Sequence, residues 1–371
     1  MQSGSLNIIW IYGRDYLACT ISKKRIYGGV DLFKLIAAIF VLLLHSIETS
    51  TGVLYGIKFS ITLFAVPFFF IASGFFFYSG LDHSENKQSY FWKYEKNIAK
   101  LYLVWALIIY LPFQIVSYIK MNPGASPIKI VLLLFRRFFV IGAGPYWYLL
   151  ALMLSAACLF IIYKIKKDRL LYFLIVFGLI LEVLYSCFNG LLGNVFPINL
   201  FYKATYFVFS WEFNFIMYGI PFMGIGYLIS KHGLTLSVKA STIVFISATL
   251  LRVFEYNTPY IFPGDFWKNN QISIAFIFQA VAFFMLAKEL NINIRKETSL
   301  TIRQLSSFIY FLHAIVLYDI LNPLLAQITD WPIYSGWFIP IKMVMVLIPC
   351  CVLFAVIKKI NNKHLNLLIN G

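Results

Sequence analysis

The sequence has 371 residues, of which 61% are hydrophobic and 12% are charged, and its mean hydropathy is +0.80. Soluble domains carry about 25% charged residues, so this composition excludes an ordinary soluble protein. The formal net charge of +16 does not indicate a nucleic-acid partner, because so apolar a chain leaves no soluble basic face to bind one. The composition predicts an all-α integral membrane protein whose first partner is the lipid bilayer.

Recurrent apolar runs, each about 18 to 20 residues and so long enough to cross roughly 30 Å of hydrocarbon, follow one another along the chain. They lie at residues 30–49, 59–80, 101–119, 145–163, 170–187, 212–230, 240–257, 271–287, 305–326 and 336–357. We expect each run to form one transmembrane helix, which gives a bundle of about ten. Residues 1–29 are then an N-terminal extension, residues 30–357 one membrane domain and residues 358–371 a C-terminal tail.

The distribution of basic residues predicts the orientation. If the first run enters from the cytoplasm, 21 of the 31 Lys and Arg residues fall in cytoplasmic segments, seven in outer segments, and Lys34, Arg252 and Lys342 within runs. Cytoplasmic loops of membrane proteins are enriched in Lys and Arg. We therefore expect a multi-pass protein of the cell membrane with both termini in the cytoplasm.

A further apolar stretch, residues 128–140, lies between the third and fourth runs. It is too short to span the bilayer, and it carries Arg136 and Arg137 in its middle. This combination predicts an interfacial or re-entrant helix.

Polar residues within the runs are the candidates for function, because a charge at the bilayer centre costs about 2.5 to 3.5 kcal/mol. In the first run, His45 follows Lys34 by eleven residues, which is about three helical turns and roughly 16 Å. The two side chains therefore share one face, as a long anionic ligand bound end-on would need. The alternative is that Lys34 extends to the inner headgroups and His45 to the outer ones.

Two later runs contain further candidates. His313 lies about two turns into the otherwise apolar ninth run, where a hydrogen-bonded packing histidine is an equal alternative. In the second run, Ser73 and Gly74 let a helix or a ligand approach the backbone, and helix packing is the commoner reason for such a pair. The sequence contains no Walker loop, paired-cysteine site or His-Glu-x-x-His, so we expect neither ATP hydrolysis nor a metal.

Together these stretches resemble the membrane acyltransferase family 3, whose first helix carries a basic residue, ten residues and then a histidine, here Lys34 and His45. The resemblance continues, in the family's order, through Val66–Phe75, Gly144–Leu150 and Ile309–His313. The sequence is also faintly similar to the glycopeptide-resistance serine proteins, in which a racemase-like domain accompanies the membrane part; we expect no such domain in this chain.

The resemblance implies transfer of an acyl group, usually acetyl, from cytoplasmic acyl-coenzyme A to a hydroxyl of a cell-envelope glycan or lipid-linked sugar. A histidine can accept the hydroxyl proton near neutral pH, so we predict His45 as general base or transient acyl carrier. His313 would orient the acceptor or His45. These two are the predicted catalytic residues.

The acyl-coenzyme A donor is predicted to enter from the cytoplasmic side, with Lys34 holding its phosphate or pyrophosphate. Ser73 and Gly74 would line a passage for the narrow pantetheine arm. The family often has paired arginines after the second helix; this chain instead has lysines there, and Lys96 and Lys100 are the predicted donor-binding residues.

Two other functions stay open at this stage. A transporter or flippase of polysaccharide or small polar solutes also carries intramembrane charges, although the sequence shows no inverted repeat. A non-catalytic membrane module that binds an amino acid or a sugar for a separate enzyme is the third. Ligand binding without consumption of coenzyme A would distinguish that module.

Overall fold

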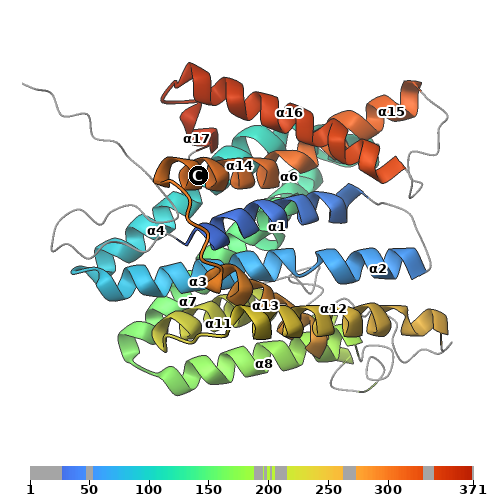
Figure 1. The fold of residues 1–371 in the computed structure, drawn as a ribbon. Helices are drawn as coiled ribbons and strands as arrows, with labels where there is room; N and C mark the ends of the chain where they lie inside the picture. The colour runs from blue at the N-terminus through green and yellow to red at the C-terminus, as the bar shows by residue number, and fades with distance from the viewer. Residues whose placement is uncertain are drawn as a thin grey trace, which may run out of the picture.

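The computed structural model describes residues 27–46, 53–187, 195, 199–200, 203–204, 215–261, 273–328 and 338–369. These residues fold into helices, and no strand occurs among them, so the all-α prediction is confirmed. The long helices lie side by side along one axis, as Figure 1 shows. Of the N-terminal extension predicted for residues 1–29, residues 1–26 lie outside the described residues.

The first half of the chain forms long, partly interrupted helices. Its elements are α1 (Gly28–Ser46), α2 (Val53–Thr62), α3 (Ala65–His83), α4 (Lys87–Tyr102), the π-helical η1 (Leu103–Tyr110), α5 (Leu111–Met121), α6 (Pro127–Arg136), the π-helical η2 (Arg137–Ile141), the 3₁₀ turn η3 (Gly144–Tyr146), α7 (Trp147–Ile165) and α8 (Asp168–Cys187). A single turn separates α2 from α3, and η1 joins α4 to α5 without a break.

The second half follows the same pattern. Its elements are the π-helical η4 (Phe215–Gly219), α11 (Ile220–Lys231), α12 (Val238–Ile261), α13 (Ile274–Glu289), α14 (Lys296–Ala314), the π-helical η6 (Ile315–Leu321), α15 (Asn322–Ile328), α16 (Ile339–Ile360) and α17 (Asn366–Ile369). The π-helical segment η6 joins α14 to α15 in one continuous helix.

Six helical stretches of the described chain are long and apolar enough to cross a membrane. They are Gly28–Ser46, Gly56–His83, Lys87–Met121, Gly144–Ile165, Lys296–Ile328 and Ile339–Ile360. Helices α8, α11, α12 and α13 occupy the other four predicted runs. The multi-pass membrane class follows from these helices, and the count of ten spans and the orientation of the termini stay predictions.

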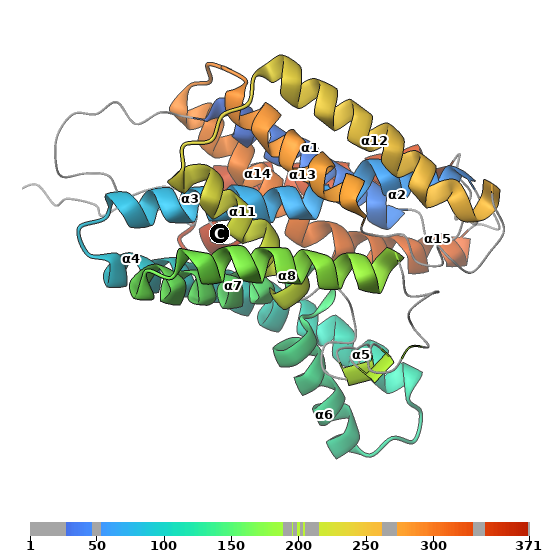
Figure 2. The ribbon, with the colours of Figure 1, turned by 90° about the horizontal axis from the view of Figure 1, so that it is seen from below.

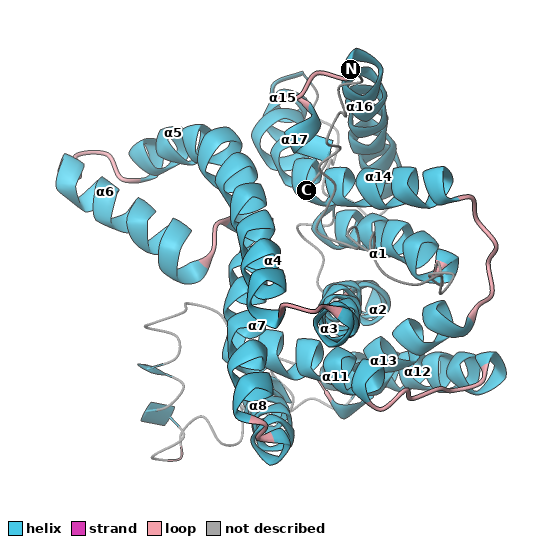
Figure 3. Ribbon diagram, turned by 90° about the vertical axis from the view of Figure 1, so that its left-hand side faces the viewer, coloured by secondary structure: helices cyan, strands magenta, loops and turns pink. Residues whose placement is uncertain are grey.

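Helix α1 lies inside the bundle, next to α14, α3 and α13 (Figure 3). Asp31, near the start of α1, contacts Ser299 and Arg303 of α14, and His45, near its end, contacts His313. The two helices therefore run in the same direction, as the first and ninth spans of the predicted topology would.

Helices α3 and α11 cross at very short distance because glycines face each other's backbone. A methyl group on Gly74 would overlap the carbonyl oxygen of Met223, and one on Gly226 would overlap that of Ile71. Small residues allow this close approach between membrane helices. The crossing fixes the position of Ser73, which precedes Gly74 in α3.

Helices α5 and α6 form a hairpin that projects from the side of the bundle (Figure 2). Neither helix has a buried residue. Their exposed apolar side chains include Val116, Ile119, Met121, Ile128, Val131, Leu132 and Phe135. The stretch predicted as an interfacial or re-entrant helix, residues 128–140, forms α6 and most of η2 in this hairpin; its position relative to a membrane surface stays a prediction.

Candidate active site

Two histidines from different helices meet inside the bundle. The ring centroids of His45, near the end of α1, and His313, near the end of α14, are 5.2 Å apart. His313 is fully buried, and His45 is partly buried. The structure thus brings together the two residues that the sequence predicts to be catalytic.

Hydrogen bonds assign the proton of the neutral His45 ring. Nδ1 of His45 lies 3.0 Å from the Tyr318 hydroxyl oxygen, and that hydroxyl donates to the backbone carbonyl of His45 at 3.2 Å. A tyrosine hydroxyl has one proton to donate, so both contacts are satisfied when Nδ1 donates to it. This assignment leaves Nε2 of His45 as the basic nitrogen.

The same reasoning applies to His313. Its Nδ1 lies 2.7 Å from the carbonyl oxygen of Tyr310 and 3.2 Å from that of Ile309. Carbonyl oxygens only accept, so Nδ1 donates and Nε2 carries the lone pair. No hydrogen-bond partner for Nε2 of His313 occurs in the described part of the chain, although this atom is buried.

Tyr318 joins the site because of the π-helical segment η6. Tyr318 is the fifth residue after His313. Five residues of an α-helix turn by about 500°, which places the two side chains on different faces. The i to i+5 geometry of a π-helix brings such residues back toward alignment, and π segments are frequent at functional sites. The apolar pattern of the sequence does not predict Tyr318, because a π-helical segment leaves no mark in that pattern.

The other family-like motifs contact α14 one turn before His313. The Tyr146 hydroxyl donates to the carbonyl of Phe311 at 2.8 Å, and the Tyr310 hydroxyl donates to the carbonyl of Pro145 at 3.0 Å. The Gly144–Leu150 motif is therefore bonded in both directions to the Ile309–His313 motif.

The Val66–Phe75 motif joins the same group. The Ser73 hydroxyl donates to the carbonyl of Phe69 at 2.7 Å, and its oxygen lies 3.1 Å from the Tyr148 hydroxyl. The rings of Phe69 and Tyr148 both lie against Tyr310, at 5.6 and 5.7 Å. These contacts, and the close crossing at Gly74, are packing contacts; a pantetheine passage along Ser73 and Gly74 stays a prediction.

Lys34 lies toward the opposite end of α1, about 16 Å from His45 along the helix axis. Only 4% of Lys34 is exposed, and its ammonium lies 5.0 Å from the ring centroid of Phe76. Its backbone carbonyl accepts a hydrogen bond from Ser306 at 2.8 Å. One turn earlier, Asp31 pairs with Arg303 of α14 at 3.3 Å, so this end of the interface between α1 and α14 is charged.

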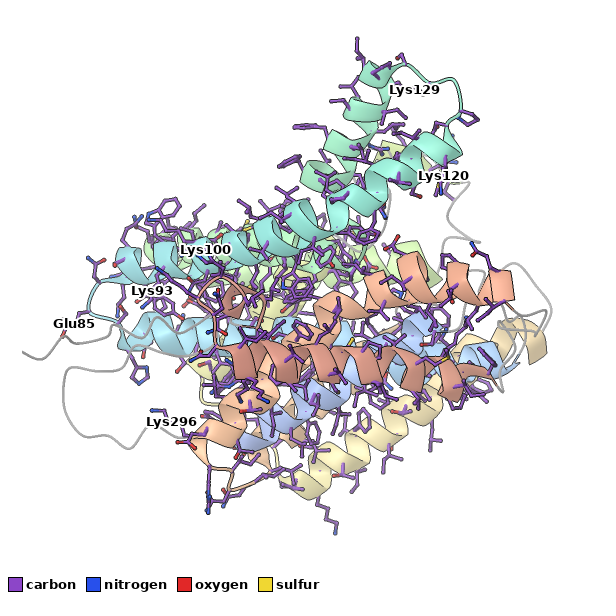
Figure 4. The ribbon with its side chains drawn as sticks, turned by 90° about the horizontal axis from the view of Figure 1, so that it is seen from above. Glu85, Lys93, Lys100, Lys120, Lys129 and Lys296 are labelled. Atoms are coloured by element: carbon purple, nitrogen blue, oxygen red, sulfur yellow. The ribbon has the colours of Figure 1, made fainter. Side chains whose placement is uncertain are left out.

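Lys96 and Lys100 are exposed on α4 and do not contact the histidine pair. Figure 4 shows Lys93 and Lys100 at the same end of the bundle as Lys296, and far from Lys129 on the hairpin. Lys93 and Lys100 of α4 therefore lie with Lys296 at a basic end of the molecule. The role of Lys96 and Lys100 in donor binding stays a prediction.

The geometry and the comparisons together identify the class. The described chain is an all-helical membrane protein in which two histidines of different helices lie against each other, one of them fully buried. The chain belongs to the acyltransferase family 3: the family model, described as an acyltransferase domain, matches residues 27–368. No group of three or more His, Cys, Asp or Glu side chains that could hold a metal occurs within the described ranges.

Similarity to curated proteins is weaker and partial. The chain is 27% identical over 222 residues to an amino-acid racemase of Enterococcus faecalis, which covers 57% of this chain and 29% of that protein. It is 24% identical over 312 residues to a second amino-acid racemase of the same species, covering 79% and 41%. The chain thus spans less than half the length of these relatives. No solved structure matches it.

Proposed function

We propose that this membrane acyltransferase moves an acyl group, acetyl in the simplest case, from acyl-coenzyme A to a hydroxyl of a cell-envelope glycan or lipid-linked sugar. The observation that carries the proposal is the histidine pair, in which hydrogen bonds to both Nδ1 atoms leave two Nε2 lone pairs available. A base of this kind within reach of a hydroxyl is what transfer from a thioester requires.

In the proposed reaction, Nε2 of His45 takes the proton of the acceptor hydroxyl while the hydroxyl oxygen attacks the thioester carbonyl. The bond from carbonyl carbon to sulfur breaks, an ester forms, and the imidazolium of His45 returns the proton to the leaving thiolate. Tyr318 holds the His45 ring in place through Nδ1, and His313 orients the acceptor hydroxyl. Positioning of this kind contributes several kcal/mol beyond proton transfer itself.

The donor's phosphates are proposed to bind at the basic end. Lys34 lies about 16 Å from His45 along α1, which suits an extended donor that reaches from its phosphates to its thioester. Lys96 and Lys100 on α4 would attract the nucleotide part, because exposed lysines act on phosphate as point charges.

The test compares wild type, His45→Ala and His83→Ala, each purified and placed in liposomes with radiolabelled acetyl-coenzyme A and a cell-envelope glycan extract. His83 is an exposed histidine at the end of α3 and serves as the matched control. We expect label in the glycan with wild type and His83→Ala and none with His45→Ala. Near-normal transfer by a folded His45→Ala variant contradicts the assignment.

A second candidate is a membrane module that binds an amino acid for a separate enzyme. It is favoured by the relatives named amino-acid racemase, because the chain matches only 29% and 41% of their lengths. Such a module would bind an amino acid and leave acyl-coenzyme A unconsumed. A polysaccharide or small-solute transporter would instead move its substrate across the liposome membrane without coenzyme A.

A further inference from the structure

The Gly144–Leu150 motif is bonded to α14, but the proposed reaction assigns it no role. Its third residue, Tyr146, is fully buried and lies in the 3₁₀ turn η3. The Tyr146 hydroxyl donates to the carbonyl of Phe311 at 2.8 Å, two residues before His313. The carbonyl that accepts this bond belongs to the last turn of α14, just before the π-helical η6 begins.

Backbone hydrogen bonds at the end of α14 show what the Tyr146 bond replaces. In a regular α-helix the amide of Ile315 would donate to the Phe311 carbonyl, four residues earlier. Here that amide donates to the carbonyl of Leu312 instead. A buried carbonyl needs a donor from within the protein, because the membrane interior offers no water. The Tyr146 hydroxyl therefore provides a hydrogen bond at the place where the α-helical pattern ends.

The turn η3 holds Tyr146 in this position from its own side. Gly144 has a φ of +50°, a conformation that favours glycine, and a methyl group there would lie 2.9 Å from the Tyr110 hydroxyl. Pro145 follows with its fixed φ, and its carbonyl accepts a hydrogen bond from the Tyr310 hydroxyl at 3.0 Å. The two hydrogen bonds between η3 and α14 run in opposite directions, so neither element can slide past the other without breaking them.

The change from α-helix to π-helix decides where Tyr318 lies. Tyr318 contacts Nδ1 of His45 at 3.0 Å from within η6. If Ile315 bonded the Phe311 carbonyl, the α-helix would continue past this point. Its shorter period would then turn Tyr318 away from His45. The Tyr146 hydroxyl stabilises the arrangement in which Tyr318 reaches His45.

We propose that Tyr146 is a positioning residue, which holds η6 in its π-helical form and thereby holds Tyr318 against Nδ1 of His45. Its effect on acyl transfer passes through Tyr318. The role in transfer rests on the proposed function, whereas the effect on the His45 ring does not. The proposal also gives a physical reason for the glycine and proline that precede Tyr146 in the motif, because they fix the turn that carries its hydroxyl.

The first measurement follows the His45 ring without any acyl transfer. The sequence has five histidines, so full-length protein with isotope-labelled histidine in detergent gives few nitrogen NMR signals, and His45→Gln identifies those of His45. At a pH where the ring is neutral, the two nitrogen signals give the share of rings that carry the proton on Nδ1. Wild type is compared with Tyr318→Phe, Tyr146→Phe and Tyr102→Phe.

Tyr102→Phe is the matched control. Tyr102 is a buried tyrosine whose hydroxyl also donates to a backbone carbonyl, that of Phe138 in η2. The variant loses the same kind of bond and keeps the bonds between η3 and α14. If Tyr146→Phe does not fold, Tyr310→Phe removes the reciprocal bond to Pro145 and replaces it in the comparison.

We expect the proton of His45 to lie on Nδ1 in wild type and Tyr102→Phe, and to be shared between both nitrogens in Tyr318→Phe. Tyr146→Phe should move the His45 signals toward those of Tyr318→Phe. Signals of Tyr146→Phe that equal those of wild type overturn the proposal, and so does a Tyr318→Phe spectrum identical to that of wild type. An equal change in Tyr102→Phe overturns it as well, because the effect would then not be specific to η3.

Transfer kinetics then test the role of Tyr146 in the reaction. In a transferring enzyme, Tyr146→Phe should lower kcat several-fold, by no more than Tyr318→Phe does, with both KM values nearly unchanged. In the Tyr318→Phe background, the same change should lower kcat by less than about twofold, the usual limit of additivity. Effects of the two changes that multiply in kcat overturn the proposal.

Failure of this inference is distinguishable from failure of the proposed function. Protein that consumes no acyl-coenzyme A, but whose His45 signals respond to Tyr146→Phe, keeps the positioning role and refutes the proposed reaction. Transfer that depends on His45 and is unchanged in Tyr146→Phe keeps the proposed reaction and refutes the positioning role.

Discussion

Replacement of Tyr318 by phenylalanine tests the assigned roles of the two nitrogens of His45. The variant keeps the ring and removes the hydroxyl, which lies 3.0 Å from Nδ1 and donates to the His45 carbonyl at 3.2 Å. Nδ1–H then loses its acceptor, and the basic character of Nε2 is no longer fixed. Since Tyr318 is 39% exposed, loss of the hydroxyl should cost the folded state little stability.

The expected decrease in kcat of Tyr318→Phe follows from the change in charge of His45 during the reaction. A neutral hydrogen bond contributes about 0.5 to 1.5 kcal/mol and one to a charged group about 1.5 to 3 kcal/mol. The Tyr318 bond is neutral in the ground state and charged when His45 has taken the proton, so the difference is about 1 to 1.5 kcal/mol. Only that difference lowers kcat, by roughly five- to thirteenfold.

The matched control is Tyr172→Phe, because Tyr172 contacts His232 at 2.8 Å in an exposed pair outside the bundle interior. Initial rates of transfer in liposomes give kcat and KM for both variants. We expect kcat to fall about tenfold in Tyr318→Phe, with both KM values nearly unchanged and Tyr172→Phe like wild type. An unchanged kcat, or a fall of more than about a thousandfold in folded protein, would refute the reasoning.

The remaining predictions concern the donor end and the helix crossing. Lys34→Ala should raise KM for the donor more than it lowers kcat, and equal changes in both would contradict a binding role. Lys96→Gln together with Lys100→Gln should raise donor KM at low salt and lose the effect at high salt, because exposed charges are screened; Lys129→Gln on the hairpin is the control (Figure 4). Gly74→Val should lower stability by about 1 to 3 kcal/mol, seen as a reduced thermal midpoint, because its methyls overlap the Met223 carbonyl; an unchanged midpoint would refute the close crossing.

Much of the fold is predictable from the sequence because hydrocarbon imposes a simple rule on apolar length. Every predicted run coincides at least in part with a helix among the described residues, and the all-α class is confirmed. Run length could not show that α4 and α5 continue through η1 into one helix of 35 residues, Lys87–Met121. It also could not show that α5 leaves the bundle, since that depends on its packing partners.

The sequence predicts the positions of candidate site residues that lie on regular α-helices. It does not predict those in a π-helical segment, where the helical period changes. Lys34 and His45 share a face by α-helical spacing, and the family resemblance assigned His313 to the same site, where it lies against His45. Tyr318 lies in a π-helical segment, so α-helical spacing assigns it the wrong direction. The close approach of Gly74 to the Met223 backbone is a helix-packing contact, which is one of the two roles that the sequence allows for Gly74.

The arrangement along α1 and α14 bears on the choice between acyl transfer and transport. Each helix carries a cation toward its start and a histidine toward its end: Lys34 and His45 on α1, and Arg303 and His313 on α14. Because the helices run in the same direction, the cations lie at one end of their interface and the bases meet about 16 Å further on. Transport sites gather their polar groups near the bilayer midplane. Here the cations and the histidines form two separate polar groups along the same helix pair. That separation suits a long donor whose phosphates and thioester are recognised at different depths. Acyl transfer therefore accounts for more of this structure than transport does.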